Sequence, residues 1–540
     1  MARSGAAVNS PLLGAVLVEA LLACGVTDFV LAPGSRNSAV SLALHEAEVA
    51  GRLRLHVRVD ERVAAFTALG LAKASQAVTA VVTTSGSAVG NLLPAAMEAR
   101  AAGVGIVFVT TDRPAELVGT GASQTTEQVG ALSPAVHRTI RISSTANNER
   151  GWAAAVSRAM AIAAGARTRQ PGPVQLNVEF TEPLISTVPK AAVSVPTIHH
   201  SRPSAPVQLA AGPRTVVLVG DATPEVGAQA RAVAEAAGVP LLAEPTSNAR
   251  AGECASQHYR LLLGSLLGRD IERVICYGHP TLSRPVSQLL GRNQLELIVV
   301  TDQAEWSDAG HGATQVVDAV ELAAGEPDWL RRWQEADATL AQRRETSWGG
   351  LQLAETVVTS LGSEHNLVLG ASMIIRDADL AAIAECPPVC YANRGLAGID
   401  GTIATATGIA LATGRPTTVL LGDLTLQHDL GALVAVPGEA QPDLRIVVSD
   451  DSGGAIFSLL EQGAPEYGAA FERVFATPQQ IDLASVAESL GWAVSVVTDD
   501  AELRAALRAP MSGRSVIVAK VDRATRRAAA AALRRLGKQL

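Results

Sequence analysis

Acidic side chains follow two predicted strands in the last third of the chain. An apolar run over Thr417–Leu421 leads directly into Gly422-Asp423, and Asp450 and Asp451 follow another run over Leu444–Val448. Because adjacent parallel strands end at one edge of a sheet, we expect Asp423 to lie beside one of the other two. With a backbone carbonyl they would offer Mg²⁺ hard oxygen ligands, and the neighbouring glycines would let a diphosphate approach the backbone. The alternative is a pair of acidic turns without a metal.

Three charged residues occupy equivalent places in the first third of the chain. Arg36, Glu61 and Arg113 each lie on a turn that follows a predicted strand, which is where open α/β sheets bind ligands. Each also has an ordinary explanation. Arg36 sits in a helix-capping turn, Glu61 would offset a helix dipole, and Arg113 would be a surface arginine. Taken singly, none of the three establishes a site.

The composition excludes several classes of protein. The chain has 540 residues, 48% of them hydrophobic and 18% charged, with a net charge of −8; these values argue against disorder and against a nucleic-acid partner. Only four lysines occur, none in a Walker loop, and no Gly-x-Gly-x-x-Gly motif follows a strand. The remaining basic residues are arginines, which suit forked recognition of carboxylates and phosphates.

Cysteine usage and hydropathy bear on the compartment. The five cysteines lack disulfide or zinc spacing, so we expect unreactive thiols in a reducing compartment. No uncharged apolar run reaches the roughly 18 residues of a membrane span. The apolar stretch Leu12–Val26 is interrupted by Glu19 and predicts an amphipathic helix rather than a signal peptide. Together these features predict a soluble, cytoplasmic protein without a membrane span.

The elements that must position the charged residues alternate along the whole chain. Short β-branched runs such as Val78–Thr84 and Thr215–Val219 are separated by Ala- and Leu-rich helical stretches, a pattern typical of doubly wound parallel α/β sheets. A proline-rich stretch over Ser186–Thr215 reads as a linker, and a charged helix is predicted over Glu326–Thr346. Three α/β domains are therefore predicted, at residues 1–185, 190–345 and 346–540.

Seven motifs, in chain order, resemble those of thiamine-diphosphate (ThDP) enzymes with pyrimidine-binding, central and diphosphate-binding domains. The finer resemblance is to the 2-succinyl-5-enolpyruvyl-6-hydroxy-3-cyclohexene-1-carboxylate synthases of menaquinone biosynthesis. It covers the first and third predicted domains, and the central one matches weakly. The motifs are Ala32–Ser38 (APGSRNS), Asp60–Phe66 (DERVAAF), Ser85–Leu92 (SGSAVGNL), Thr111–Glu116 (TDRPAE), Asn393–Gly401 (NRGLAGIDG), Gly422–Leu430 (GDLTLQHDL) and Gly453–Leu460 (GGAIFSLL).

The resemblance implies a transferase that decarboxylates 2-oxoglutarate with ThDP and adds the resulting carbanion to isochorismate in a 1,4-addition. Glu61 would hydrogen-bond the pyrimidine ring and promote loss of the thiazolium proton, and Ile399 would bend ThDP into its reactive shape. Asp423, Asp451 and the Gly453 carbonyl would hold Mg²⁺, or Mn²⁺ in its place. The implied cofactor-binding set is Glu61, Ser372, Ile399, Gly422, Asp423, Leu424, Asp451, Gly454, Ile456 and Phe457.

Both implied substrates are polyanions, and charge-assisted pairs with arginine fix carboxylates in distance and plane. In this family the first domain of one subunit faces the third domain of another across the cofactor. The resemblance therefore implies a homodimer, or a homotetramer built from dimers. The implied catalytic and substrate-binding set is Glu61, Ser35, Arg36, Arg113 and Gln124 from the first domain, Arg284 from the central one, and Ser372, Arg376 and Arg394 from the third.

Two positions depart from the family pattern, and two other functions are considered. An Asp stands where the second metal ligand is usually Asn, in a loop longer than in some members, so Asp450 is an alternative to Asp451. Ala371 stands where some relatives carry Asn. One rival is another ThDP carboligase, similar to acetohydroxyacid synthase, which needs fewer arginines. The other is an inactive ThDP-fold binding module, against which Glu61 and the Gly422-Asp423 pair argue.

Overall fold

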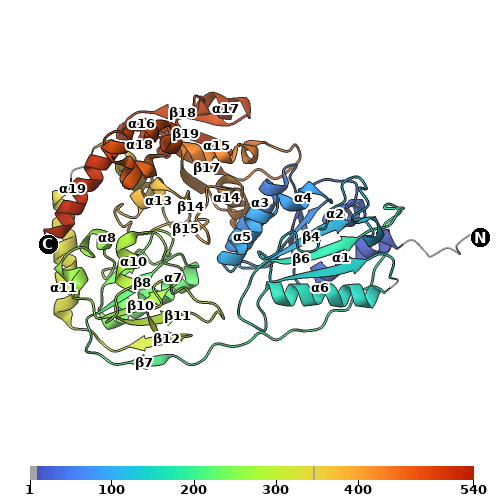
Figure 1. Cartoon of the computed structure of the whole chain (residues 1–540), viewed down its shortest axis with the longest axis horizontal. Helices are drawn as coiled ribbons and strands as arrows, with labels where there is room; N and C mark the ends of the chain where they lie inside the picture. Colours follow the sequence, from blue (N-terminus) through green and yellow to red (C-terminus); the bar gives the residue numbers. More distant parts are fainter. Residues whose placement is uncertain (1–8, 147, 345–346, 540) are drawn as a thin grey trace, which may run out of the picture. The chain divides into compact units, whose positions relative to one another are not determined.

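The computed structural model describes residues 9–146, 148–344 and 347–539, which divide into two compact units (Figure 1). Unit 1 comprises the chain up to Ser201 together with Asp400–Gly414 and Asp429–Pro442. Unit 2 comprises Arg202–Ile399, Arg415–His428 and the chain from Asp443 onward. Unit 1 is therefore formed by three separate segments of the chain. The boundaries of the three predicted domains stay predictions.

Unit 1 is built on a six-stranded parallel sheet. Every residue of its four middle strands is buried, which explains their continuous apolar runs in the sequence. The strand order is β2 (Arg54–Val57), β1 (Asp28–Leu31), β3 (Thr79–Thr83), β4 (Ile106–Asp112), β6 (Val174–Glu179) and β5 (Arg138–Ser143). The helices are α1 (Ser10–Ala23), α2 (Ser38–Val49), α3 (Glu61–Ser75), α4 (Ser87–Gly90), α5 (Leu93–Ala101), α6 (Glu149–Ala163) and α14 (Thr402–Thr413).

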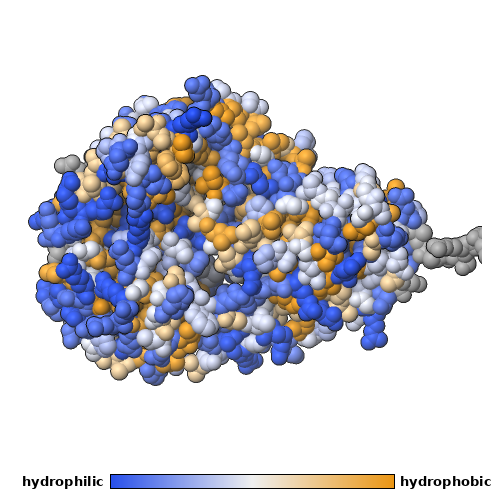
Figure 2. All heavy atoms as spheres, viewed as in Figure 1, coloured by the Kyte–Doolittle hydropathy of each residue, from blue (hydrophilic) through white to orange (hydrophobic). Residues whose placement is uncertain are grey.

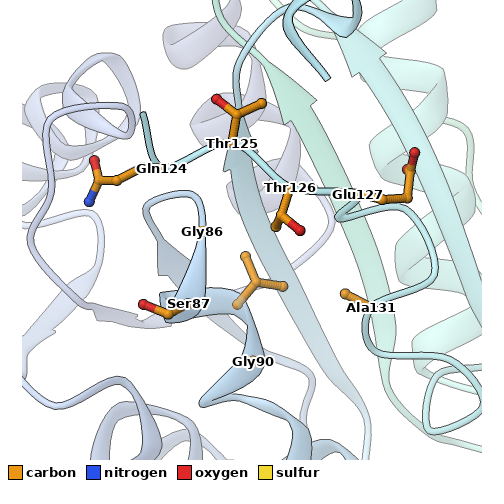
Figure 3. A pocket seen from close by; sticks show the side chains of 9 residues that line it. Gly86, Ser87, Gly90, Gln124, Thr125, Thr126, Glu127 and Ala131 are labelled. Atoms are coloured by element: carbon orange, nitrogen blue, oxygen red, sulfur yellow. The ribbon is translucent and has the colours of Figure 1, made fainter. Parts of the chain in front are cut away.

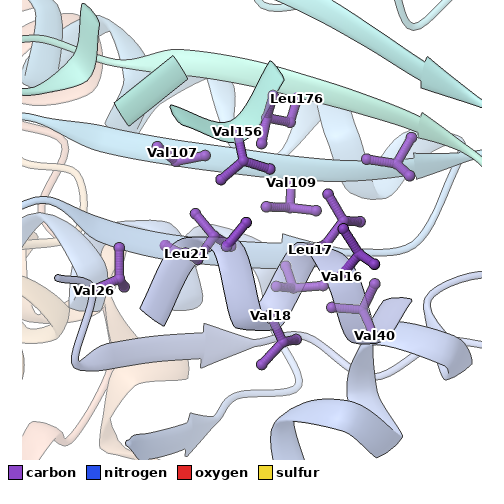
Figure 4. Packing of buried hydrophobic residues seen from close by; sticks show 14 of the residues in the cluster. Val16, Leu17, Val18, Leu21, Val26, Val40, Val107, Val109, Val156 and Leu176 are labelled. Atoms are coloured by element: carbon purple, nitrogen blue, oxygen red, sulfur yellow. The ribbon is translucent and has the colours of Figure 1, made fainter. Parts of the chain in front are cut away.

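Two apolar clusters cover the two faces of this sheet. On one face α1, α2 and α6 pack against strand residues that include Val107 and Val109 (Figure 4). On the other face α3 and α5 pack against residues that include Val81 and Phe108. Successive residues of β4 thus serve opposite faces, as the two-residue period of a strand requires.

Helix α14 packs closely against α3 within unit 1. A Cβ atom at Gly70 would lie 1.9 Å from the carbonyl oxygen of Thr405, and one at Gly408 would lie 2.1 Å from that of Thr67. Only glycine allows two helix backbones to approach in this way. The helix that begins with Glu61 is therefore held against α14 along its length.

We expect Gly408→Ala to lower the melting temperature. The added methyl group would overlap the Thr67 carbonyl oxygen and force the helices apart, and such overpacking costs about 1–3 kcal/mol. Scanning calorimetry of the purified variant measures the effect. Gly362→Ala is the control, because a Cβ there would meet nothing within 4 Å. Equal melting temperatures for the two variants would contradict the close contact.

Unit 2 contains two further parallel sheets and a short two-stranded pair. The central sheet runs in the order β12 (Ala313–Val317), β11 (Glu296–Val300), β10 (Arg273–Tyr277), β8 (Thr215–Val219) and β9 (Leu241–Ala243). The short pair is β13 (Val320–Leu322) and β7 (Val207–Leu209). The helices around these strands are α7 (Pro224–Ala237), α8 (Tyr259–Leu262), α9 (Leu266–Arg269), α10 (Arg284–Leu290) and α11 (Pro327–Arg343).

The C-terminal sheet of unit 2 has six strands, all parallel. Their order is β15 (Val389–Tyr391), β14 (Asn366–Leu369), β16 (Thr417–Gly422), β17 (Leu444–Asp450), β19 (Arg514–Lys520) and β18 (Ala493–Val497). The helices are α12 (Gly350–Ser360), α13 (Met373–Ala378), α15 (Asp423–His428), α16 (Gly468–Phe471), α17 (Leu483–Ser489), α18 (Asp500–Arg508) and α19 (Arg526–Lys538). The predicted class of doubly wound parallel α/β sheets is confirmed.

The surface and the cysteines bear on the predictions from composition, and Cys386 is the exposed member of the cysteine set. On the face drawn in Figure 2, apolar residues lie in small areas separated by polar ones. Within the described ranges no helix is both long and apolar enough to cross a membrane. All five cysteines are free, and burial raises the pKa of the Cys276 thiol to about 12. A buried thiol with a raised pKa is unreactive.

Candidate active site

Glu61 is the first residue of α3, directly after the turn that follows β2. Asp60 caps this helix, since its Oδ1 accepts from the backbone N–H groups of Arg62 at 2.8 Å and Val63 at 3.2 Å. The side chain of Asn91 donates to Glu61 Oε2 at 3.0 Å. The cap and this hydrogen bond fix the carboxylate at the carboxyl end of the unit 1 sheet.

The N-terminus of α14 is held by a buried carboxylate that the sequence interpretation did not single out. Asp429 is fully buried, and its Oδ2 accepts from the backbone N–H groups of Ile403 at 2.8 Å and Ala404 at 3.1 Å. Gly401, in the preceding turn, has φ 58° and no room for a Cβ, which would lie 2.0 Å from the Phe66 ring. This turn directly follows Ile399 in the chain and depends on glycine.

Asp429 predicts a pH-dependent stability. Burial raises its pKa to about 6, so its ionisation opposes folding. The protonated Asp429 carboxyl group stabilises the folded state fully when the pH lies below the ordinary aspartate pKa of about 4. This stabilisation is lost as the pH rises through about 6. Between pH 4 and 7 we expect the melting temperature of Asp429→Asn to fall less steeply with pH than that of the wild-type protein. Thermal unfolding of both proteins across that range is the measurement, and parallel curves would contradict the assignment.

Arg36 and Arg113 lie close together in unit 1. Burial and the charge of Arg113 both lower the pKa of Arg36. Arg36 Nη1 donates to the carbonyl oxygen of Phe180 at 3.0 Å, while Arg113 Nη1 donates to Ser85 Oγ at 2.6 Å and to the Gln124 carbonyl oxygen at 2.7 Å. Two neighbouring guanidinium groups favour an anion between them.

A hollow of about 430 Å³ lies beside this cluster in unit 1 (Figure 3). It is formed by the turn that leads into α4 and by the loop after Gln124. Gly86 has φ 84°, and its N–H donates to Gln128 Oε1 at 2.9 Å. This hydrogen bond fixes the turn. The lining residues are Gly86, Ser87, Val89, Gly90, Gln124, Thr125, Thr126, Glu127 and Ala131.

In unit 2, Asp423 begins α15 directly after β16. Its Oδ1 accepts from the N–H of Leu424 at 2.8 Å and its Oδ2 accepts from the N–H of Gly453 at 2.7 Å. The two acidic loops therefore meet, as the sequence predicts. Burial raises the pKa of Asp423 to about 6, and the nearby Asp450 adds to the rise.

The other two candidate carboxylates both have cationic partners. Asp450 is ion-paired with Lys520. Asp451 Oδ2 lies 3.1 Å from Arg526 Nη2, and burial raises the pKa of Asp451 to about 7 although Arg526 opposes the rise. Arg526 Nη1 also donates to Asp377 Oδ2 at 2.7 Å. Arg526 thereby connects the acidic loop to α13.

The glycines of the acidic loop are required by its geometry. Gly453 has φ 131°, and a Cβ there would lie 2.3 Å from the Ala476 carbonyl oxygen. The N–H of Gly454 donates to that same oxygen at 2.7 Å. Ile456 and Phe457 follow on a short 3₁₀ helix over Ala455–Leu459. The loop is thus held closely against the segment that contains Ala476.

The predicted arginines of unit 2 differ in their surroundings. Arg376 Nη1 donates to the Ser372 carbonyl oxygen at 2.6 Å. Arg394 is only 2% exposed and its Nη2 donates to Thr281 Oγ1 at 2.9 Å. Arg284, in contrast, has a side chain that is 70% exposed and pairs with Glu461 at 2.8 Å. The roles proposed for all three stay predictions.

Most of the predicted site residues lie where a parallel strand ends, which is the position expected for ligand binding in such sheets. Residues 35 and 36 follow β1, 61 follows β2 and 113 follows β4; 372 and 376 follow β14, 394 follows β15, 423 and 424 follow β16, and 451–457 follow β17. Among the described residues, no three His, Cys, Asp or Glu side chains converge closely enough to form a metal site by themselves. A metal here would need backbone or cofactor ligands as well.

Two family models match the chain. The thiamine pyrophosphate enzyme N-terminal TPP binding domain matches residues 12–131, and the corresponding C-terminal TPP binding domain matches residues 368–521. The first range contains Glu61, Arg36 and Arg113, and the second contains both acidic loops. The candidate residues of unit 1 thus fall in the first TPP binding domain and the acidic loops of unit 2 in the second.

Curated relatives match almost the whole chain, and several bear one name, 2-succinyl-5-enolpyruvyl-6-hydroxy-3-cyclohexene-1-carboxylate synthase. One from Kineococcus radiotolerans is 47% identical over 94% of this chain and 95% of its own length. One from Paenarthrobacter aurescens is 46% identical over 95% and 94%, respectively. One from a Nocardioides species is 44% identical over 95% of both. The chain belongs to the family of ThDP-dependent 2-succinyl-5-enolpyruvyl-6-hydroxy-3-cyclohexene-1-carboxylate synthases.

Proposed function

We propose that the protein catalyses the decarboxylation of 2-oxoglutarate and the 1,4-addition of the resulting succinyl unit to isochorismate. The product would be 2-succinyl-5-enolpyruvyl-6-hydroxy-3-cyclohexene-1-carboxylate, released with CO₂. The observation that carries this proposal is the full-length similarity to relatives named for that product, at 47% identity in one case. Glu61 and the arginines that follow the strand ends support it, and one of these arginines, Arg394, is buried.

ThDP fits the residues present. When bound, ThDP supplies the electron sink that decarboxylation and carbon–carbon bond formation require. Glu61 would hold a proton at the pyrimidine ring, because its carboxylate is fixed by Asn91 at 3.0 Å. Ile399, Gly454, Ile456 and Phe457 are proposed to contact the cofactor.

A divalent cation fits the acidic loops. The raised pKa values of Asp423 and Asp451 arise chiefly from burial, and buried carboxylates of this kind are stabilised by a cation. We propose that Asp423, Asp451 and the Gly453 carbonyl hold Mg²⁺ or Mn²⁺, with oxygen ligands that suit these ions. Gly422 and Leu424 would line the diphosphate beside it.

The arginines are proposed to bind the substrate carboxylates. Arg36 and Arg113 would act with Ser35 and Gln124 in unit 1, and Arg376 and Arg394 with Ser372 in unit 2. The two substrates together carry four carboxylate groups, so a set of forked cationic donors suits them. Arg284 is proposed to contribute from its exposed position at the start of α10.

The direct test is the mass of the product formed by the purified protein with ThDP, Mg²⁺, 2-oxoglutarate and isochorismate, with each component omitted in turn. We expect a ring product that carries the succinyl unit and requires all four. Bound ThDP without this adduct would refute the proposal and favour another 2-oxoacid donor or an inactive module.

We also propose a homodimer as the active form of the enzyme. Light scattering measures the oligomeric state, and full activity in a stable monomer would contradict this proposal.

A further inference from the structure

Glu244 is a buried carboxyl group in unit 2 to which the proposed reaction gives no role. It directly follows β9 and is 1% exposed. Its Oε1 accepts from the N–H of Leu282 at 2.9 Å, and the N–H of Thr281 also faces the carboxyl group. Both N–H groups belong to the loop between β10 and α10. Glu244 therefore holds this loop by its backbone.

The same loop contacts a candidate substrate-binding arginine. The hydroxyl of Thr281 accepts from Arg394 Nη2 at 2.9 Å. Arg394 is 2% exposed, and its Nε has no hydrogen-bond partner among the described residues. A buried guanidinium with an unused donor is costly unless another acceptor reaches it. Its orientation toward such an acceptor depends on where the loop places Thr281.

We propose that Glu244 is a positioning residue that fixes the Thr281 loop and, through the Thr281 hydroxyl, orients Arg394 toward a substrate carboxylate. The proposal deepens the proposed function and rests on it, because Arg394 is assigned to substrate only there. It also gives the central sheet a part in substrate recognition, since Glu244 and Thr281 both follow strands of that sheet.

The charge of Glu244 indicates which replacement will be tolerated. Burial raises its pKa to about 8, with the charge of Asp379 adding to the rise and that of Arg394 opposing it. At neutral pH the side chain is therefore mostly a neutral hydrogen-bond acceptor, which glutamine reproduces in size and shape. The titratable and charged groups around it are Asp379, Tyr259, Cys276, Arg376 and Arg394.

The test compares Glu244→Gln, Glu244→Ala and Thr281→Val at pH 7 in the synthase assay. We expect Glu244→Ala and Thr281→Val to raise by about tenfold the KM of the substrate whose KM also rises in Arg394→Ala, as the loss of one hydrogen bond to a charged group predicts. The kcat should change much less. Glu244→Gln should stay close to wild type. A fall in kcat without a change in KM would overturn the proposal.

A double-mutant cycle tests the route through Arg394. In the Arg394→Ala background, Glu244→Ala should produce no further rise in KM, because the residue it positions is already absent. Additive effects would overturn the proposal. Equal damage from Glu244→Gln and Glu244→Ala would overturn the assignment of a neutral acceptor.

Two further measurements separate positioning from stability and from the proposed function. Asp337 is a matched control, since its carboxylate accepts from the N–H groups of Gln257 at 2.7 Å and His258 at 2.8 Å without any contact to Arg394. Asp337→Ala should lower the melting temperature but leave both KM values unchanged; a KM rise equal to that of Glu244→Ala would overturn the proposal.

Hydrogen exchange in the peptide that contains Thr281 and Leu282 reports the loop without any substrate. Exchange should accelerate in Glu244→Ala and not in Glu244→Gln. Unchanged exchange in Glu244→Ala would overturn the proposal even in an active enzyme. Absence of the succinyl adduct with the wild-type protein would instead refute the proposed function itself.

Discussion

Glu61→Gln is expected to abolish nearly all turnover while the fold and most of the ThDP affinity remain. The amide matches the carboxylate in shape and can still contact Asn91, but it cannot stabilise a protonated pyrimidine ring. Positioned proton transfer contributes about 10²–10⁴-fold to rates, so a loss of about 10³-fold in kcat is expected. The measurements are product formation at saturating substrates and ThDP binding by calorimetry.

Asp60→Asn is the matched control for this variant. It makes the same carboxyl-to-amide change one residue earlier, and asparagine caps helices as well as aspartate does. Its Oδ1 can still accept from the N–H groups of Arg62 and Val63. We expect its activity to stay close to wild type. Near-normal rates in Glu61→Gln would remove Glu61 from the proton-transfer role.

Asp423→Asn should weaken Mg²⁺-dependent ThDP binding by about 100-fold. It removes a buried negative charge from the proposed metal site, and an interaction of this kind is worth about 3 kcal/mol. The amide also replaces an oxygen that accepts from the Gly453 N–H at 2.7 Å or from the Leu424 N–H at 2.8 Å. Titration with ThDP at several Mg²⁺ concentrations is the measurement, and unchanged affinity would contradict a metal at this loop.

The same titration distinguishes Asp450 from Asp451. We expect Asp451→Asn to weaken Mg²⁺-dependent ThDP binding as Asp423→Asn does. Asp450→Asn should leave this affinity nearly unchanged, because the Asp450 carboxylate is ion-paired with Lys520. The reverse result would make Asp450 the ligand. Comparison with Arg526→Lys reports how far the ion pair at 3.1 Å, rather than a metal, holds Asp451 in place.

The sequence predicts several of the fully buried strands, and it also predicts β15 and β18 at the edges of the C-terminal sheet. β3, β4, β8 and β17 are buried on both faces and therefore form uninterrupted apolar runs. Edge strand β5 carries a weaker signal, because its sequence RTIRIS contains only two apolar residues and most of the strand is accessible. A continuous apolar run is therefore easier to recognise as a strand than a short segment dominated by polar residues.

The candidate site could be predicted where residues follow neighbouring strands of one parallel sheet. Asp423 and the loop after β17 were expected to meet because neighbouring parallel strands end at one edge, and the hydrogen bond from Gly453 to Asp423 confirms that they do. Arg526 could not be found in the same way. It lies on the C-terminal helix, far along the chain from Asp451, and no local pattern distinguishes it from other arginines. Glu244 did carry a signal, since a lone carboxylate follows a buried strand.

The division of unit 1 among three chain segments has a consequence for its synthesis. When residue 201 leaves the ribosome, the six strands of the sheet are complete, but α14 and the segment with Asp429 are still untranslated. The face of α3 that contains Gly70 stays without its partner α14 until more than two hundred further residues have been translated. At ordinary elongation rates this takes about 10–40 s. During that interval the face of α3 that later packs against α14 stays uncovered. A fragment ending near residue 201 would keep that surface bare permanently.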